Sequence, residues 1–83
     1  MSRTVTQDQI ENLVDNSSVE ARNYGSKTTV VVCTLPSGFV IVESSSCVDP
    51  ANFDSDIAFD ICMERITNKL WELEGYRLQC SRN

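Results

Sequence analysis

One segment of this chain, residues 30–42, carries the strongest structural signal, because two apolar runs flank a short turn. It reads Val30-Val31-Val32-Cys33-Thr34-Leu35-Pro36-Ser37-Gly38-Phe39-Val40-Ile41-Val42. β-Branched residues are enriched in strands, and proline followed closely by glycine marks a turn. The segment therefore predicts a β-hairpin with strands at about residues 28–35 and 39–44.

The turn leaves two hairpin registers open. A two-residue turn at Ser37 and Gly38 would pair Pro36 with Phe39. A type I turn led by Pro36, with Gly38 in a left-handed bulge position, would pair Leu35 with Phe39. Proline favours the second register because its fixed φ suits the first central position of a type I turn.

Either register places apolar side chains on both faces of the hairpin. Val31, Cys33 and Leu35 point one way, whereas Val30 and Val32 point the other. One helix covers only one face, so we expect the second face to meet the N-terminal helix, another subunit or a partner. An uncovered sheet of this kind promotes association, which favours a homodimer.

A long helix is expected after the hairpin. Asp49 is placed to cap it and Pro50 to occupy its first position, where the missing N–H costs nothing, and Val48 could staple onto Phe53. Downstream apolar residues follow the 3,4 spacing of one helical face, widened by Ile61. They are Phe59, Cys62, Met63, Ile66, Leu70 and Leu73.

The sequence also predicts where this helix ends. Gly75 is well placed as the left-handed residue after Glu74, which would bring Tyr76 back against Trp71. The helix would then be roughly 37 Å long, unless residues 52–54 interrupt it.

The N-terminal part predicts a short helix and one more strand. Thr6 and Gln9 form a capping box before an apolar pattern at helical spacing, which indicates a helix at about residues 7–15. Such a helix needs docking to be stable. Residues 19–24 alternate as a strand, followed by a turn at 25–27. Residues 1–83 are therefore expected to form a single α+β domain, a small antiparallel three-stranded sheet packed by a long C-terminal helix and a short N-terminal helix.

Composition excludes several functions. Twelve acidic residues against seven basic ones give a net charge of −5, which disfavours direct binding to nucleic acid. Without any histidine, nucleophile–histidine catalysis and mixed Cys/His metal sites are impossible. The apolar runs are far shorter than the roughly 20 residues of a membrane span. We expect a protein that is not an enzyme, with no catalytic residue, cofactor, metal or membrane segment.

The four cysteines do not form a disulfide framework or a metal motif. Cys33, Cys47, Cys62 and Cys80 contain no Cys-x-x-Cys pair, and no apolar run near the N-terminus resembles a signal peptide. We expect reduced thiols in the cytosol. Cys33 and Cys62 fit the core, and carboxylates near Cys47 oppose thiolate formation there.

Three motifs resemble a small family of tailed-phage proteins, typified by podophage gene product 49 and a Shigella phage gene 66. They are the hairpin with Gly38-Phe39, then Ser45-x-Cys47-Val48-x-Pro50-x-Asn52-Phe53-Asp54, and then Leu70-Trp71-x-Leu73-Glu74-Gly75-Tyr76. The resemblance runs from Thr28 to about Leu78, and the N-terminal third shows no clear match. It implies a phage or prophage accessory protein in the host bacterial cytoplasm and no particular mechanism.

The chain departs from this family at two places. Relatives usually have Asn-Gly where this chain has Ser37-Gly38, and often Gly-Glu where it has Glu43-Ser44. A binding role of that family glutamate cannot be carried to Ser44.

Two groups of polar residues are candidate binding sites. Ser45 and Ser46 belong to a serine run that is expected to lead into a helix N-terminus, where hydroxyls and free N–H groups could hold a phosphate or nucleotide. Nearby aspartates would repel such an anion, so a structural loop is the main alternative.

Asp56, Asp60 and Glu64 stand at i, i+4 and i+8 on one helical face. Such a row could bind a divalent cation or imitate a phosphate backbone towards a DNA-binding host protein. Its alternative is an ordinary solvated face.

Trp71 and Tyr76 could anchor a partner or close the helix over the core. The leading hypothesis is therefore a non-enzymatic phage accessory protein that binds a host protein and alters a host process or defence. The alternative is a small-ligand or nucleotide-sequestering protein, with its ligand at the serine run or at an oligomer interface.

Overall fold

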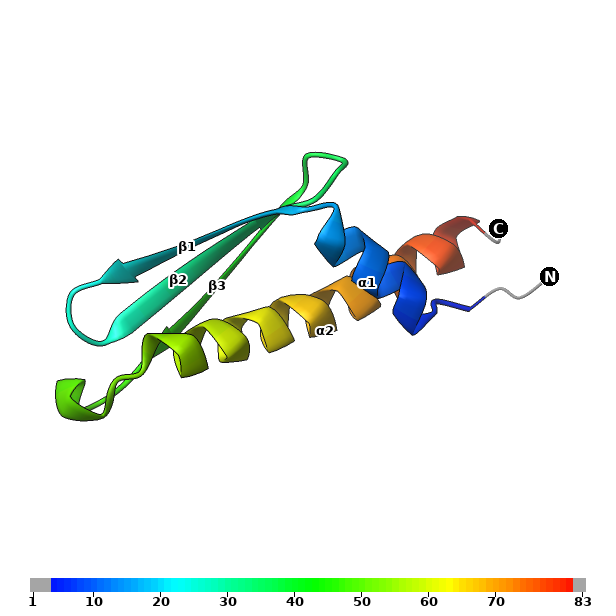
Figure 1. Cartoon of the computed structure of the whole chain (residues 1–83). Coiled ribbons are helices and arrows are strands. Elements are labelled where there is room, and N and C mark those ends of the chain that lie inside the picture. Colours follow the sequence, from blue (N-terminus) through cyan, green and yellow to red (C-terminus); the bar gives the residue numbers. More distant parts are fainter. Residues whose placement is uncertain (1–3, 82–83) are drawn as a thin grey trace.

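The computed structural model describes residues 4–81, and at Pro50 the backbone alone. Its elements are α1 (Gln7–Asp15), β1 (Ser18–Tyr24), β2 (Thr28–Thr34), β3 (Val40–Ser46), a 3-10 turn η1 (Pro50–Asn52) and α2 (Ser55–Ser81). The strands form one antiparallel sheet in the order β1-β2-β3. Figure 1 shows the two long features, the sheet and α2, running side by side, with α1 against the C-terminal half of α2. The predicted α+β fold is confirmed.

The hairpin between β2 and β3 takes the second of the two predicted registers. The Leu35 N–H donates to the Phe39 carbonyl at 2.8 Å, and the Gly38 N–H donates to the Leu35 carbonyl at 2.8 Å. Gly38 has a φ of +96°, the left-handed conformation that glycine adopts without a steric penalty. The register follows from this turn and places Cys33 opposite Ile41 on the buried face.

β3 is longer than the sequence predicts. The predicted strand ends at Ser44, whereas β3 continues through Ser45 to Ser46. Ser44, Ser45 and Ser46 pair with Val30, Thr29 and Thr28. The Thr28 and Ser46 hydroxyls lie 2.9 Å apart and share a hydrogen bond. The serine run is therefore a strand and not the expected loop, because the register of the hairpin carries these residues along the full length of β2.

The start of α2 also differs from the prediction. Asp49 caps only η1, where its carboxylate accepts from the Ala51 N–H at 3.0 Å. Asp54 caps α2 instead, accepting from the Asp56 N–H at 2.9 Å. The interruption at residues 52–54 is thus real, because each aspartate accepts a hydrogen bond from a free backbone N–H in the first turn of its own helix. Val48 is 94% exposed, so the predicted staple onto Phe53 is wrong.

The end of α2 lies beyond Gly75, which the sequence assigned to a left-handed cap. Among the described glycines only Gly25 and Gly38 have positive φ, and α2 runs on to Ser81. The predicted closure of Tyr76 against Trp71 is therefore wrong, and Tyr76 is 72% exposed. Glu74 and Arg77, on either side of the glycine, are joined by two hydrogen bonds of 2.9 and 3.0 Å.

The short helix α1 begins and ends as predicted. The Thr6 hydroxyl accepts from the Gln9 N–H at 3.2 Å, which is half of the expected capping box. The side-chain nitrogen of Gln9 donates to Glu74 of α2 at 2.8 Å, so this side chain is directed to the other helix. At the other end, the Asn12 carbonyl accepts from the backbone N–H of Asn16 at 3.1 Å and also from the Asn16 side chain at 2.8 Å, which reinforces the last turn.

The core lies between α2 and the inner face of β2 and β3. Its buried members come from α1, β2, β3 and α2, and they are Ile10, Val31, Cys33, Ile41, Cys62, Ile66 and Leu70. Phe59, Met63 and Leu73 are half-buried around it, as their helical spacing predicts. All seven residues of β1 are exposed, so β1 extends the sheet beyond the part that α2 covers.

The outer face of the sheet is left uncovered by the described residues. Val30 and Val32 are half-buried there, and Val40 and Val42 are 48% and 56% exposed. α1 does not cover them, because Ile10 joins the core on the opposite side of the sheet. Of the three occupants that the sequence left open for this face, the N-terminal helix is excluded.

Candidate functional site

A groove of about 390 Å³ runs between α1 and α2. Its walls are Gln7, Ile10, Glu11, Val14 and Asp15 of α1 and Thr67 and Trp71 of α2. Ile10 is 2% exposed and Trp71 is 39% exposed, so the groove has an apolar floor and an accessible indole. Exposed tryptophans beside apolar pockets are frequent anchor points for protein partners.

The rim of the groove is acidic. Glu11 and Asp15 are exposed on α1, a helix without a basic residue. None of the three basic residues of α2 lines the groove. Arg65 donates to the Ser44 carbonyl at 2.7 Å, Arg77 pairs with Glu74, and Lys69 lines a separate hollow beside β3. The groove therefore presents negative charge around an aromatic ring.

The predicted row of acidic side chains on α2 projects from the helix in nearly the same direction as Trp71. Asp60 and Glu64 stand eleven and seven residues before Trp71, which is close to whole helical turns, so the three side chains project within about 20° of one direction. Asp56, Asp60 and Glu64 are all exposed. They do not line the groove, but they extend its negative charge over the adjoining surface of α2.

The two aromatic candidates, Trp71 and Tyr76, do not form one site. Five residues separate them, which turns Tyr76 about 140° away from Trp71 around the helix. Trp71 faces the groove beside α1, whereas Tyr76 stands on another side of α2 with 72% exposure. Of the pair, the structure brings only Trp71 together with other candidate residues.

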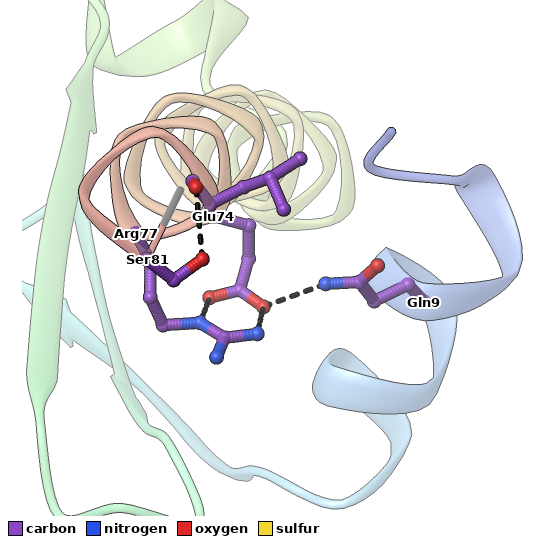
Figure 2. A network of polar contacts seen from close by, with 5 residues as sticks. Gln9, Glu74, Arg77 and Ser81 are labelled. Atoms are coloured by element: carbon purple, nitrogen blue, oxygen red, sulfur yellow. Dashed lines mark hydrogen bonds and ion pairs between the residues drawn. The ribbon is translucent and has the colours of Figure 1, made fainter. Parts of the chain in front are cut away.

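A separate polar network, whose residues do not line the groove, also fixes α1 on α2 (Figure 2). Glu74 accepts from the Gln9 amide at 2.8 Å and from two guanidinium nitrogens of Arg77 at 2.9 and 3.0 Å. These bonds favour the ionised carboxylate, so Arg77 first and Gln9 second hold the pKa of Glu74 below its ordinary value of 4.5, against the opposing effect of burial. The Glu74–Arg77 pair spans Gly75, and α2 continues as a helix to Ser81.

This network predicts a pH dependence of stability. Because the pKa of Glu74 is lower in the folded state, its contribution is fully present above about pH 4.5 and is lost as the pH falls through the folded-state value. Glu74→Gln should lower the urea midpoint at pH 7 and flatten its decline between pH 5 and 3. Glu72→Gln, which changes an exposed carboxylate nearby, is the matched control. Equal declines in wild type and Glu74→Gln would contradict this account of the network.

Ser45 and Ser46 lie at a different part of the molecule. They line a cavity of about 140 Å³ near the start of α2, together with Phe53, Asp54 and Ile57 among others. Small-molecule sites usually measure about 300–1,000 Å³, and the Asp54 carboxylate repels anions. The geometry of this cavity therefore gives the nucleotide hypothesis no support.

The cysteines of the core lack the features of a nucleophile. Cys33 and Cys62 are fully buried. Burial raises the pKa of the Cys62 thiol, and the charge of Arg65 opposes only part of that effect. A raised pKa keeps the sulfur protonated and unreactive at neutral pH.

Residues 4–81 contain neither a cluster of metal-binding side chains nor a helix suited to crossing a membrane. No set of three acidic or cysteine side chains in this range is gathered closely enough to hold a metal ion. Neither described helix combines the length and apolar character that crossing a bilayer requires.

Sequence reasoning missed the contribution of α1 to the groove. Glu11 and Asp15 are spaced i, i+4 beside the apolar Ile10 and Val14, and this pattern alone indicates an ordinary amphipathic helix. Only the docking of α1 beside Trp71 turns these residues into one wall of a groove.

Comparison with known proteins identifies the family of this chain. A family model described as "Phage protein (N4 Gp49/phage Sf6 gene 66) family" matches residues 5–81. No curated protein and no solved structure gives a significant match. The match begins in front of α1, so it includes the N-terminal third, where the motifs alone showed no resemblance. It therefore takes in both walls of the groove and the whole sheet, and the chain belongs to the phage protein (N4 Gp49/phage Sf6 gene 66) family.

Proposed function

We propose that this phage protein is a non-enzymatic accessory protein that acts in the host bacterial cytoplasm by binding a host protein. The observation that carries the proposal is the groove between α1 and α2, with its apolar floor, the accessible ring of Trp71 and the carboxylates of Glu11 and Asp15. The bound element would be a basic segment of the host protein.

The chemistry of the groove supports a basic partner. A lysine or arginine over the face of an indole gains about 0.5–2 kcal/mol, and carboxylates at the rim pair with further basic residues. The aliphatic stem of the same side chain can cover the apolar floor. Asp60 and Glu64 continue the negative charge along α2, which favours encounter with a positively charged surface.

A lysate experiment tests this proposal. Tagged wild-type protein is expected to retain a specific bacterial protein in a salt-sensitive manner. Trp71→Ala and the double variant Glu11→Lys/Asp15→Lys should each reduce the recovered amount at least about tenfold, because a central aromatic anchor and a charged rim are lost. Tyr76→Ala is the matched control, since it removes an exposed aromatic residue from another side of the same helix and should have no effect.

A direct measurement accompanies the lysate experiment. Trp71 is the single tryptophan of the chain, so its fluorescence reports on the groove without a label. An arginine-rich peptide should change the emission of the wild type with saturation, and less strongly in Glu11→Lys/Asp15→Lys. Retention of a host protein that is insensitive to both groove variants, with no spectral response to the peptide, would overturn the proposal.

A further inference from the structure

The two edges of the sheet differ in how they are protected. At β3, the guanidinium of Arg65 reaches from α2 to the Ser44 carbonyl at 2.7 Å, which occupies an outward backbone group of that strand. At β1, no other described strand lies beside the free edge, and every residue of the strand is exposed. An unprotected edge strand is a template for pairing with another chain.

The hydrogen-bond pattern shows which groups of β1 are free. Leu35 bonds to Phe39, and the Cys47 N–H bonds to the Lys27 carbonyl at 2.8 Å. Since bonded and non-bonded pairs alternate in an antiparallel ladder, the odd-numbered residues of β2 bond to β3 and the even-numbered ones bond to β1. Through the register of β1 with β2, the backbone groups of residues 19, 21 and 23 therefore face the open edge.

We propose that β1 pairs antiparallel with the β1 strand of a second copy of this chain, about a two-fold axis at Ala21. In this arrangement residues 18–24 of one copy pair with residues 18–24 of the other along their whole length. Ala21, which has the smallest side chain in the middle of the strand, lies on the axis. The two three-stranded sheets become one six-stranded sheet. The groove between α1 and α2 is a separate feature, so the dimer does not depend on the proposed host partner.

Charge selects this register from its neighbours. Glu20 and Arg22 lie on the same face of β1, with their side chains 3.8 Å apart. A pairing centred on Ala21 places Glu20 of each copy opposite Arg22 of the other, which gives two such pairs. A pairing centred on Glu20 would place the two Glu20 side chains opposite each other, and one centred on Arg22 would do the same with the two Arg22 side chains. Opposite charges across strands stabilise a pair and like charges destabilise it.

The charges of β1 also make a second copy of the chain a suitable partner for its open edge. The chain carries a net charge of −5, so most surfaces of two copies repel each other. β1 carries one acidic and one basic residue and is neutral. Two copies can therefore meet along this strand without the repulsion that their other acidic surfaces, such as α1 and the outward row of α2, would impose.

Cross-linking tests the axis. In a Cys47→Ser/Cys80→Ser background, Ala21→Cys places two sulfurs across a bonded pair with Cα atoms about 5.5 Å apart, within the range of a disulfide. Val19→Cys is the matched control, because its two copies would be about 14 Å apart along the strands. Oxidised glutathione should link Ala21→Cys into covalent dimers and leave Val19→Cys monomeric. Equal linking of both, or of neither, would overturn the proposed axis.

Charge exchange tests the register in solution. Sedimentation velocity from about 1 µM to 1 mM should show a concentration-dependent dimer of the wild type. Arg22→Glu should weaken it by roughly tenfold or more, because two attractive pairs become repulsive. The exchange Glu20→Arg/Arg22→Glu restores opposite charges and should return the dissociation constant to within about threefold of wild type. Circular dichroism checks that each variant is folded.

Two outcomes of this series would refute the dimer. A wild type that stays monomeric across the whole concentration range would exclude pairing of β1 with a second copy. A dimer that responds equally to the single and the double charge variant would exclude the proposed register. Neither result depends on the host-binding experiment, so failure of one proposal is distinguishable from failure of the other.

Discussion

Replacing Ile66 with alanine is expected to lower the free energy of unfolding by about 2–5 kcal/mol. Ile66 is completely buried at the centre of the core, between α2 and the inner face of the sheet. The loss combines the transfer free energy of the removed methyl groups with the cavity that they leave. A domain of this length is stable by only about 4–12 kcal/mol, so much of the population would be unfolded at moderate urea concentrations.

The matched control for Ile66→Ala is Ile57→Ala, on the same helix but 58% exposed. It makes the same chemical change while removing far less buried surface, so its effect should stay below about 1 kcal/mol. Urea unfolding followed by circular dichroism measures both. Similar losses for the two variants would contradict the assignment of the core.

Replacing Gly38 with alanine is expected to lower the free energy of unfolding by about 1–2 kcal/mol. Gly38 has a φ of +96° in the turn that sets the register of the hairpin, and a residue with a Cβ atom is strained there. The space around it is open, so the cost comes from the backbone and not from a collision with another side chain.

Gly75 provides a control of opposite sign. It lies inside α2 with ordinary helical φ, and a Cβ atom there would meet nothing within 4 Å. Gly75→Ala should therefore raise the free energy of unfolding by about 0.5–1 kcal/mol. A loss of stability on this change would show that Gly75 is a left-handed cap after all.

Gly38 and Gly75 show where local sequence patterns predict the backbone conformation correctly and where they do not. At Gly38, the neighbouring Pro36 and two β-branched runs all favour the same turn, and the predicted register is correct. At Gly75 the pattern was locally plausible, but Glu74 is engaged by Arg77 one turn later and by Gln9 from α1. Contacts between distant parts of the chain outweighed the preference of one glycine.

The start of α2 and the end of β3 also depend on more than local sequence preference. Pro50 favours Asp49 as the cap of the long helix, but Asp54 is an equally competent cap and is the one that begins α2. The serines of β3 have no strong preference for a strand, yet the ladder with β2 extends through them, because cross-strand pairing decides their conformation.

The candidate site was predictable only in part. The row of Asp60 and Glu64 could be placed on one face of α2 from helical spacing alone, whereas for Trp71 the sequence left two roles open, a partner anchor or a cover over the core. The groove itself could not be predicted, since it exists only where α1 docks. Ser45, Ser46 and Tyr76, the other candidates that the sequence offers, do not line the groove.

The sequence by itself determined the local units: a hairpin with a specified turn, two amphipathic helices with their apolar faces, and an acidic chain without histidine. These follow from short-range sterics, the period of each secondary structure and composition. Only the tertiary structure decided which cap begins α2, where α2 ends, which face of the sheet stays open and which residues of α1 meet Trp71. These outcomes depend on contacts between residues far apart in the chain, whose free energies exceed the small local preferences that a sequence pattern reports.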